Sequence, residues 1–102
     1  MSTLNIVNKS PFEKRTLDQC LSRIAAGDAV LLIEDAVVVA AAGTSYETEL
    51  KSASASHKLY VLSPDLEARG LAERSLVDGF SCVDYKGFVA LVTEHDRVHS
   101  WL

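Results

Sequence analysis

The chain is poor in the residue types that mark several large classes of protein. Its 102 residues include two cysteines, two prolines and one tryptophan, and aromatic residues make up only 7%. Cys20 and Cys82 are widely separated, which excludes a disulfide-rich scaffold and a Cys-x-x-Cys site. Lys14-Arg15 is the only adjacent basic pair, and the net charge is −4. Direct binding of DNA or RNA, which requires a concentrated basic surface, is therefore not expected.

Long apolar runs are also missing. The longest run, Ala36–Ala42, is far shorter than the ~20 residues that a helix needs to cross a bilayer. The first residues lack the charged, apolar and small-residue sections of a signal peptide. We expect a cytoplasmic protein with reduced thiols and no membrane contact. Hydrophobic residues still make up 48% of the chain, enough for a core, so residues 1–102 are expected to form one domain.

Apolar and amphipathic segments alternate along the chain. The run Ala29–Ile33 is apolar without alternation, as expected for a strand covered on both faces. Strands that alternate with helices favour a parallel sheet with right-handed crossovers. We therefore predict a three-layer, flavodoxin-like α/β domain with a mainly parallel sheet of four or five strands. The strands are expected at 3–7, 29–33, 58–62, 80–83 and 98–102, and the helices at 16–25, 36–42, 45–53, 64–69 and 85–95.

Cys20 is the first candidate for chemistry. Thr16 and Gln19 have the spacing of a capping box, which places Cys20 in the first turns of a helix. Free N–H groups and the positive end of the helix dipole favour a thiolate there, and Lys14 and Arg15 lie close by in sequence. In the alternative interpretation Cys20 is a small apolar residue packed with neighbouring leucines. Cys82, inside a short apolar strand, is expected to be core.

Acidic residues and histidines give weaker signals. Glu34-Asp35 follows a predicted strand, where magnesium-dependent phosphotransferases also place carboxylates, but we interpret Asp35 as a helix N-cap. His95 and His99 would hold a metal only if one helix included both, and no third ligand is evident, so no metal site is predicted. His57 has no companion and is expected at the surface.

The remaining polar and aromatic candidates are given structural roles. Ser10 and Ser63 lack a nucleophile elbow and a His-Asp set, so we interpret them as turn and cap residues. The polar loop from Asn8 to Arg15 contains no glycine, which argues against a flavin phosphate site, and no cofactor is predicted. Trp101 either closes the core of the chain or contacts a neighbouring protein.

Several segments are familiar when they are taken together. They resemble the TusB/DsrH family of sulfur-relay proteins, in order and over almost the full chain. The matching segments are Val7–Glu13, Gly27–Asp35, Ala41–Thr44, Leu59–Leu71, Val83–Val89 and Trp101-Leu102. Ala36 departs from the pattern, in which glycine is expected. The cysteine at position 20 makes the chain look most like the DsrH branch, because the TusB branch typically lacks it.

The resemblance implies a subunit of a heterohexamer that contains two copies each of three related chains. The partners would be DsrE-like and DsrF-like subunits, or TusD and TusC in the other branch, with DsrC or TusE as the sulfur carrier. The main expectation is a subunit of a DsrEFH-type relay in sulfur oxidation, with Cys20 as candidate persulfide carrier. Two alternatives stay open: a structural subunit without chemistry, and a TusB-like subunit of the relay for thiolation of the tRNA wobble uridine.

Overall fold

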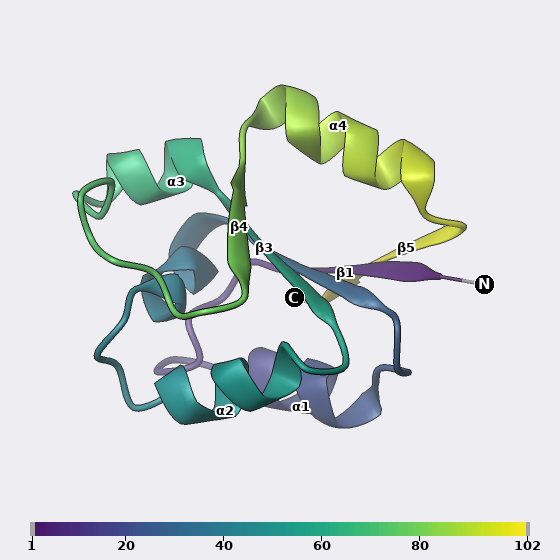
Figure 1. Cartoon of the computed structure of the whole chain (residues 1–102), viewed down its shortest axis with the longest axis horizontal. Helices are drawn as coiled ribbons and strands as arrows, with labels where there is room; N and C mark the ends of the chain where they lie inside the picture. The colour runs from purple at the N-terminus through teal and green to yellow at the C-terminus, as the bar shows by residue number, and fades with distance from the viewer. Residues whose placement is uncertain (1, 102) are drawn as a thin grey trace.

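A five-stranded parallel sheet forms the centre of the molecule (Figure 1). The computed structural model describes residues 2–101, and the strands run in the order β4-β3-β2-β1-β5. The predicted α/β fold with a parallel sheet is confirmed. The strands are β1 (Thr3–Val7), β2 (Ala29–Leu32), β3 (Lys58–Leu62), β4 (Phe80–Val83) and β5 (Arg97–Trp101). The helices are α1 (Thr16–Arg23), the 3₁₀ helix η1 (Glu34–Ala40), α2 (Glu47–Ala53), α3 (Ser63–Ala68) and α4 (Tyr85–Glu94).

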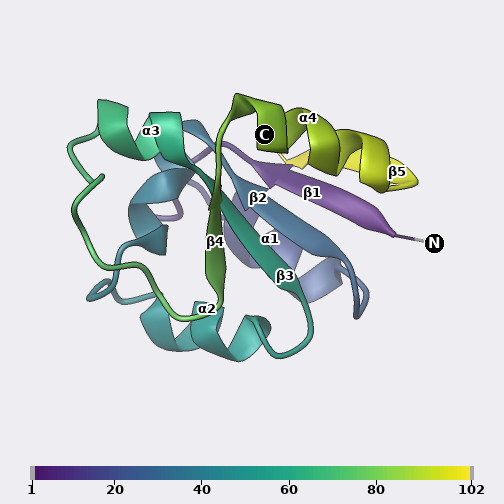
Figure 2. The ribbon, with the colours of Figure 1, turned by 45° about the horizontal axis from the view of Figure 1, so that its top comes forward.

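The strand order explains how the helices are divided between the two faces of the sheet. From β1 to β4 each strand is added next to the previous one, so right-handed crossovers place α1 and α2 on the same face. The connection from β4 must return across the sheet to reach β5 beside β1. This connection contains α4, which lies on the opposite side of the sheet from α1 and α2 (Figures 1 and 2).

The two faces carry cores of unequal size because side chains alternate along each strand. Val7, Val30 and Val61 point to the larger core, where α1, α2 and η1 pack. Leu4 and Leu31 point to the smaller core, where Leu91 and Phe88 of α4 pack. One side of the sheet is thus covered by several elements and the other side mainly by α4.

A buried amide connects the last strand to the centre of the sheet. Asn5 is only 2% exposed, and its Nδ2 donates to the carbonyl of Ala29 at 3.1 Å. The indole N–H of Trp101 donates to Asn5 Oδ1 at 3.0 Å, and the ring of His99 stacks on Trp101. Trp101 packs against the larger core, so it closes the core of its own chain. Leu102, part of the predicted last strand, lies outside the described residues.

Some predicted helix boundaries are wrong for identifiable reasons. The apolar segment predicted as a helix at 36–42 is a 3₁₀ helix that begins two residues earlier, at Glu34. Asp84 is the N-cap of α4, since its Oδ1 accepts the N–H of Gly87 at 2.7 Å. Thr16 is the first residue of α1 rather than its N-cap, and no side chain caps that helix. Ser63 likewise begins α3, after an N-cap at Leu62.

Candidate functional site at the carboxyl edge of the sheet

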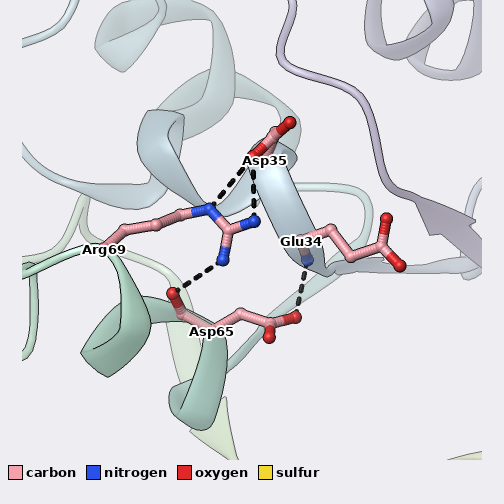
Figure 3. A network of polar contacts seen from close by, with 4 residues as sticks. All are labelled: Glu34, Asp35, Asp65 and Arg69. Carbon is pink, nitrogen blue, oxygen red and sulfur yellow. Dashed lines mark hydrogen bonds and ion pairs between the residues drawn. The ribbon is translucent and has the colours of Figure 1, made fainter.

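In parallel α/β sheets, functional groups gather where the strands end at their carboxyl termini. Here the ends of β1, β2 and β3 lead into the loop 8–15, Glu34-Asp35 and Ser63–Asp65. The structure brings the last two segments into contact, since Asp65 Oδ2 accepts the backbone N–H of Glu34 at 2.6 Å (Figure 3). These two segments therefore lie together at this edge of the sheet.

Arg69 completes a polar network at this edge, which we call the η1–α3 network (Glu34, Asp35, Asp65 and Arg69; Figure 3). Its Nε and Nη2 both donate to Asp35 Oδ1, at 3.2 and 2.8 Å, and its Nη1 donates to the carbonyl of Asp65 at 3.2 Å. Asp35 is therefore an ion-pair partner and not the predicted N-cap, a position that Ile33 occupies. Arg69 could not be linked to this site from the sequence because α3 and the acidic pair are far apart along the chain.

Glu34 has an unusual backbone conformation within this network. Its φ of +50° lies in the left-handed region, and among residues 2–101 it is the only non-glycine residue there. Such a conformation costs a residue with a Cβ roughly 1–2 kcal/mol. The hydrogen bond from the Glu34 N–H to Asp65 helps to stabilise it. The carboxylates of Asp35 and Asp65 therefore have structural partners at the edge where a phosphotransferase would use carboxylates to bind magnesium, whereas Glu34 contributes its backbone N–H.

The loop 8–15 contributes an aromatic pair. Ser10 organises the loop: its Oγ accepts the N–H of Phe12, and its carbonyl accepts two further backbone N–H groups. Its predicted role as a turn residue is confirmed. Phe12, which is 60% exposed, meets Tyr46 edge to face with ring centroids 5.5 Å apart. Desolvation, followed by the nearby Asp18 carboxylate, raises the pKa of Tyr46.

Cys20 lies below this edge in the larger core. Its side chain is 0% exposed and packs in the same cluster as Leu17, Val30 and Val37. Burial, followed by the negative charge of Asp28, raises the pKa of the Cys20 thiol to about 12. This shift is opposite to the thiolate stabilisation predicted from the helix start. At neutral pH the thiol is protonated, which makes it a poor nucleophile in this chain.

The start of α1 does not stabilise a thiolate at Cys20, because Cys20 lies too far along the helix. Counted from the N-cap Arg15, the four N–H groups without an intrahelical acceptor are those of residues 15–18, and Cys20 lies two residues beyond them. The predicted Thr16–Gln19 capping box is wrong: Gln19 donates its backbone N–H to Arg15. The Thr16 hydroxyl is buried without a hydrogen-bond partner among the described residues. Desolvation therefore determines the state of the thiol.

Cys82 is exposed, which corrects the prediction that it is core. By the alternation along β4 it shares a face with Phe80, but β4 is an edge strand, and its central residues Ser81 and Cys82 are both exposed. His95 is the C-cap of α4, with Nδ1 2.8 Å from the Leu91 carbonyl, whereas His99 is on β5. The two histidines are thus on different elements, and residues 2–101 contain no cluster of three metal-ligating side chains.

Comparisons with known proteins show the family to which the chain belongs. A family model described as "DsrH like protein" matches residues 9–98. The chain belongs to the DsrH-like family. Among curated relatives of this DsrH-like chain, protein TusB of Pectobacterium parmentieri is 36% identical over 98 residues, covering 96% of this chain and 99% of the relative. Protein TusB of Escherichia coli O81 is 38% identical over 81 residues, covering 79% and 82%. The resemblance to the TusB/DsrH family is confirmed.

Two solved structures share the fold. The first is the ychN protein from E. coli, with a TM-score of 0.78 and 17% identity, covering 98% of this DsrH-like chain and 99% of that chain. The second is MTH1491 from Methanobacterium thermoautotrophicum, with a TM-score of 0.73 and 11% identity, covering 96% and 97%. In the described part of the DsrH-like chain, every helix falls short of the length and apolarity needed to span a membrane.

Proposed function

We propose that this chain is a TusB-like subunit of the sulfur relay that thiolates the wobble uridine of tRNA, and that its contribution is structural. The similarity to curated TusB proteins, which extends over 96% of the chain in the relative from P. parmentieri, supports the relay assignment. The observation that carries the structural role is the state of Cys20. A fully buried, protonated thiol cannot take a sulfur atom from a protein partner without a rearrangement of the core.

An assembly role also needs a surface on which a partner subunit can dock. Tyr85, Val89 and Val92 lie on one side of α4, at positions i, i+4 and i+7, and are 61%, 64% and 38% exposed. We call them the α4 stripe. They flank the thinly covered side of the sheet, so a partner subunit that packs there would bury apolar side chains that face water in the isolated chain. The helical spacing of these residues was visible in the sequence but was not interpreted as an interface.

The α4 stripe can be tested by co-expressing this chain with TusC-like and TusD-like subunits. We expect Val89→Asp to reduce recovery of the complex at least tenfold, because it places a charge in an apolar interface. Ala90→Asp adds the same charge at an exposed position of α4 about 100° around the helix from Val89, and it is the matched control. Equal recovery of both variants would exclude the stripe as the interface, provided that circular dichroism shows both chains folded.

The relay assignment is tested in a bacterial strain that lacks its own TusB. Expression of this chain together with its TusC-like and TusD-like partners should restore 2-thiouridine in tRNA, measured by mass spectrometry of nucleosides. A folded, assembled complex that restores no 2-thiouridine would contradict the tRNA destination.

A second candidate is the DsrEFH-type relay of sulfur oxidation, with Cys20 as the carrier. The family model described as DsrH-like and the presence of the cysteine favour it. In that relay the Cys20 thiolate would attack the outer sulfur of a partner's persulfide. A Cys20 persulfide would form, and the partner's thiolate would leave. Incubation of the complex with a persulfide donor distinguishes the two candidates, since only the second predicts a gain of one sulfur atom at Cys20.

A further inference from the structure

A pocket of about 370 Å³ lies at the amino ends of β3 and β4, the edge of the sheet opposite the η1–α3 network. Its wall is formed by the end of α2, the link into β3 and the first residues of the two strands. The polar residues in this wall are Ser54, His57, Lys58, Tyr60 and Ser81. Neither the family assignment nor the proposed relay function gives this pocket a role.

The charge of the wall differs from that of the whole chain. The chain carries a net charge of −4, yet no carboxylate is among the residues that line the pocket. Lys58 and His57 supply side chains that can carry positive charge, and the hydroxyls of Tyr60 and Ser81 can donate hydrogen bonds. Asp78, next to the lining residue Gly79, is paired with Lys51 at 3.7 Å. The wall is therefore rich in donors and contains no competing anion.

The backbone of His57 is anchored to the end of α2. Its backbone N–H donates to the Ala53 carbonyl at 3.0 Å, at the end of α2. Its Nδ1 is shut away from solvent and has no hydrogen-bond partner among the described residues. The nitrogen left to bond a ligand in the pocket is thus Nε2. His57 is thus a half-buried residue at the rim of the pocket.

Gly79 allows the two sides of the pocket to approach each other. Its φ is +103°, and a Cβ at this position would be 2.5 Å from Cβ of Ser54. Any larger residue would have to push the end of α2 away from the start of β4. The pocket is consequently bounded by a close backbone approach that only glycine permits, and not by mobile side chains alone.

We propose that this pocket binds an oxyanion of the phosphate type, free or as the phosphate of a small nucleotide. Lysine binds phosphate as a point charge, and imidazole and hydroxyl donors complete the hydrogen bonds to its oxygens. The volume exceeds that of a bare phosphate and falls within the usual range of small-ligand pockets. The ring of Tyr60 is the surface on which an attached base would stack.

The test is an NMR titration of the full chain with inorganic phosphate, against sodium chloride at equal ionic strength. We expect saturable shifts of the backbone amides of His57, Gly79 and Ser81 that chloride does not produce. A parallel titration with uridine monophosphate distinguishes the sources. Tighter binding than that of phosphate indicates a nucleotide, and equal binding indicates the anion alone.

Variants test whether phosphate binds at this pocket and not elsewhere on the chain. Lys58→Gln and His57→Phe should each weaken phosphate binding at least tenfold, whereas Lys86→Gln, on the exposed side of α4, should leave it unchanged. Lys58 is exposed, so its replacement does not affect the core. The proposal is overturned if phosphate gives no shift beyond that of chloride, or if the Lys58 and Lys86 variants bind it equally.

Discussion

The helix dipole and burial have opposite effects on the pKa of the Cys20 thiol, and the larger effect determines whether the thiol can react. A helix dipole contributes about 0.3–1 kcal/mol near the first turn, and Cys20 lies beyond the free N–H groups. Complete burial removes the hydration that a thiolate needs, and this effect dominates. The sequence indicates that the cysteine is near a helix start, but it does not specify which side of that helix is buried.

The raised pKa of Cys20 has a consequence for stability at high pH. Burial raises the pKa of this thiol from its ordinary value of 9.0 to about 12, so between these pH values the unfolded chain loses its proton first. Stability from this group is therefore complete below about pH 9 and is lost as the pH rises toward 12, by about 1.4 kcal/mol for each pH unit. Urea unfolding at pH 8 and pH 10 measures the change.

Cys20→Ala is the reference variant for that measurement because it removes the titrating group. Between the two pH values the wild-type chain should lose about 1.4 kcal/mol more stability than the alanine variant. At pH 8 the difference in free energy of unfolding between the two chains measures how much the packing of the sulfur stabilises the fold, about 1 kcal/mol. Identical pH dependence in the two chains would show that the thiol is solvated in the folded state.

Glu34 tests whether backbone strain is present at the carboxyl edge of the sheet. Glu34→Gly removes the cost of a left-handed conformation but makes the unfolded chain more flexible, so we expect a net stabilisation of up to about 1 kcal/mol. Thr48→Gly, at an exposed position in α2, should instead destabilise the chain by about 0.3 kcal/mol, the difference between the helix propensities of threonine and glycine. Thermal unfolding of both variants distinguishes relief of backbone strain from the general cost of introducing glycine. A Glu34→Gly chain less stable than the unmodified chain would show that Glu34 is not strained.

At the scale of elements, the η1–α3 network holds a 3₁₀ helix against α3. The Asp35–Arg69 pair is partly exposed, so its charge contributes modestly, but three hydrogen bonds from one guanidinium fix the relative position of the two elements. No sequence periodicity connects residues 35 and 69. Their contact depends on the order of β2 and β3 in the sheet, which a local pattern does not specify.

Arg69→Ala should lower the free energy of unfolding by about 1 kcal/mol. Arg69→Lys should recover less than half of that loss, because an ammonium group cannot reproduce the planar set of donors. Arg23→Ala, at an exposed position at the end of α1, is the control and should change stability by less than about 0.5 kcal/mol. The measurement is denaturant unfolding. If Arg69→Ala and Arg23→Ala lower the free energy of unfolding equally, the η1–α3 network does not stabilise the fold.

At the scale of the whole molecule, the strands were the most predictable part of the fold. β1, β3 and β4 begin and end where their apolar runs and flanking polar residues indicate. The boundaries of η1 and α1 were less predictable, because an apolar run does not distinguish a 3₁₀ helix from an α-helix. The alternation of strands and helices also predicted a parallel sheet but not its strand order.

The sheet topology connects the fold to the proposed role. Because β5 returns to the side of β1 distant from β4, only one long connection crosses the second face of the sheet. That face is left thinly covered beside α4, and the α4 stripe lies next to it. The sequence contained the residues of the stripe and of the oxyanion pocket, but only the three-dimensional arrangement shows which of them face outward together.

The most direct test of the central claim is the level of 2-thiouridine in the tRNA of a TusB-deficient strain that expresses this chain with Cys20→Ala, alongside its TusC-like and TusD-like partners. A structural subunit predicts the same level as the unmodified chain, because alanine fills the buried site without a polar group. An assembled complex of normal composition that leaves tRNA without 2-thiouridine would contradict the account and identify Cys20 as a sulfur carrier.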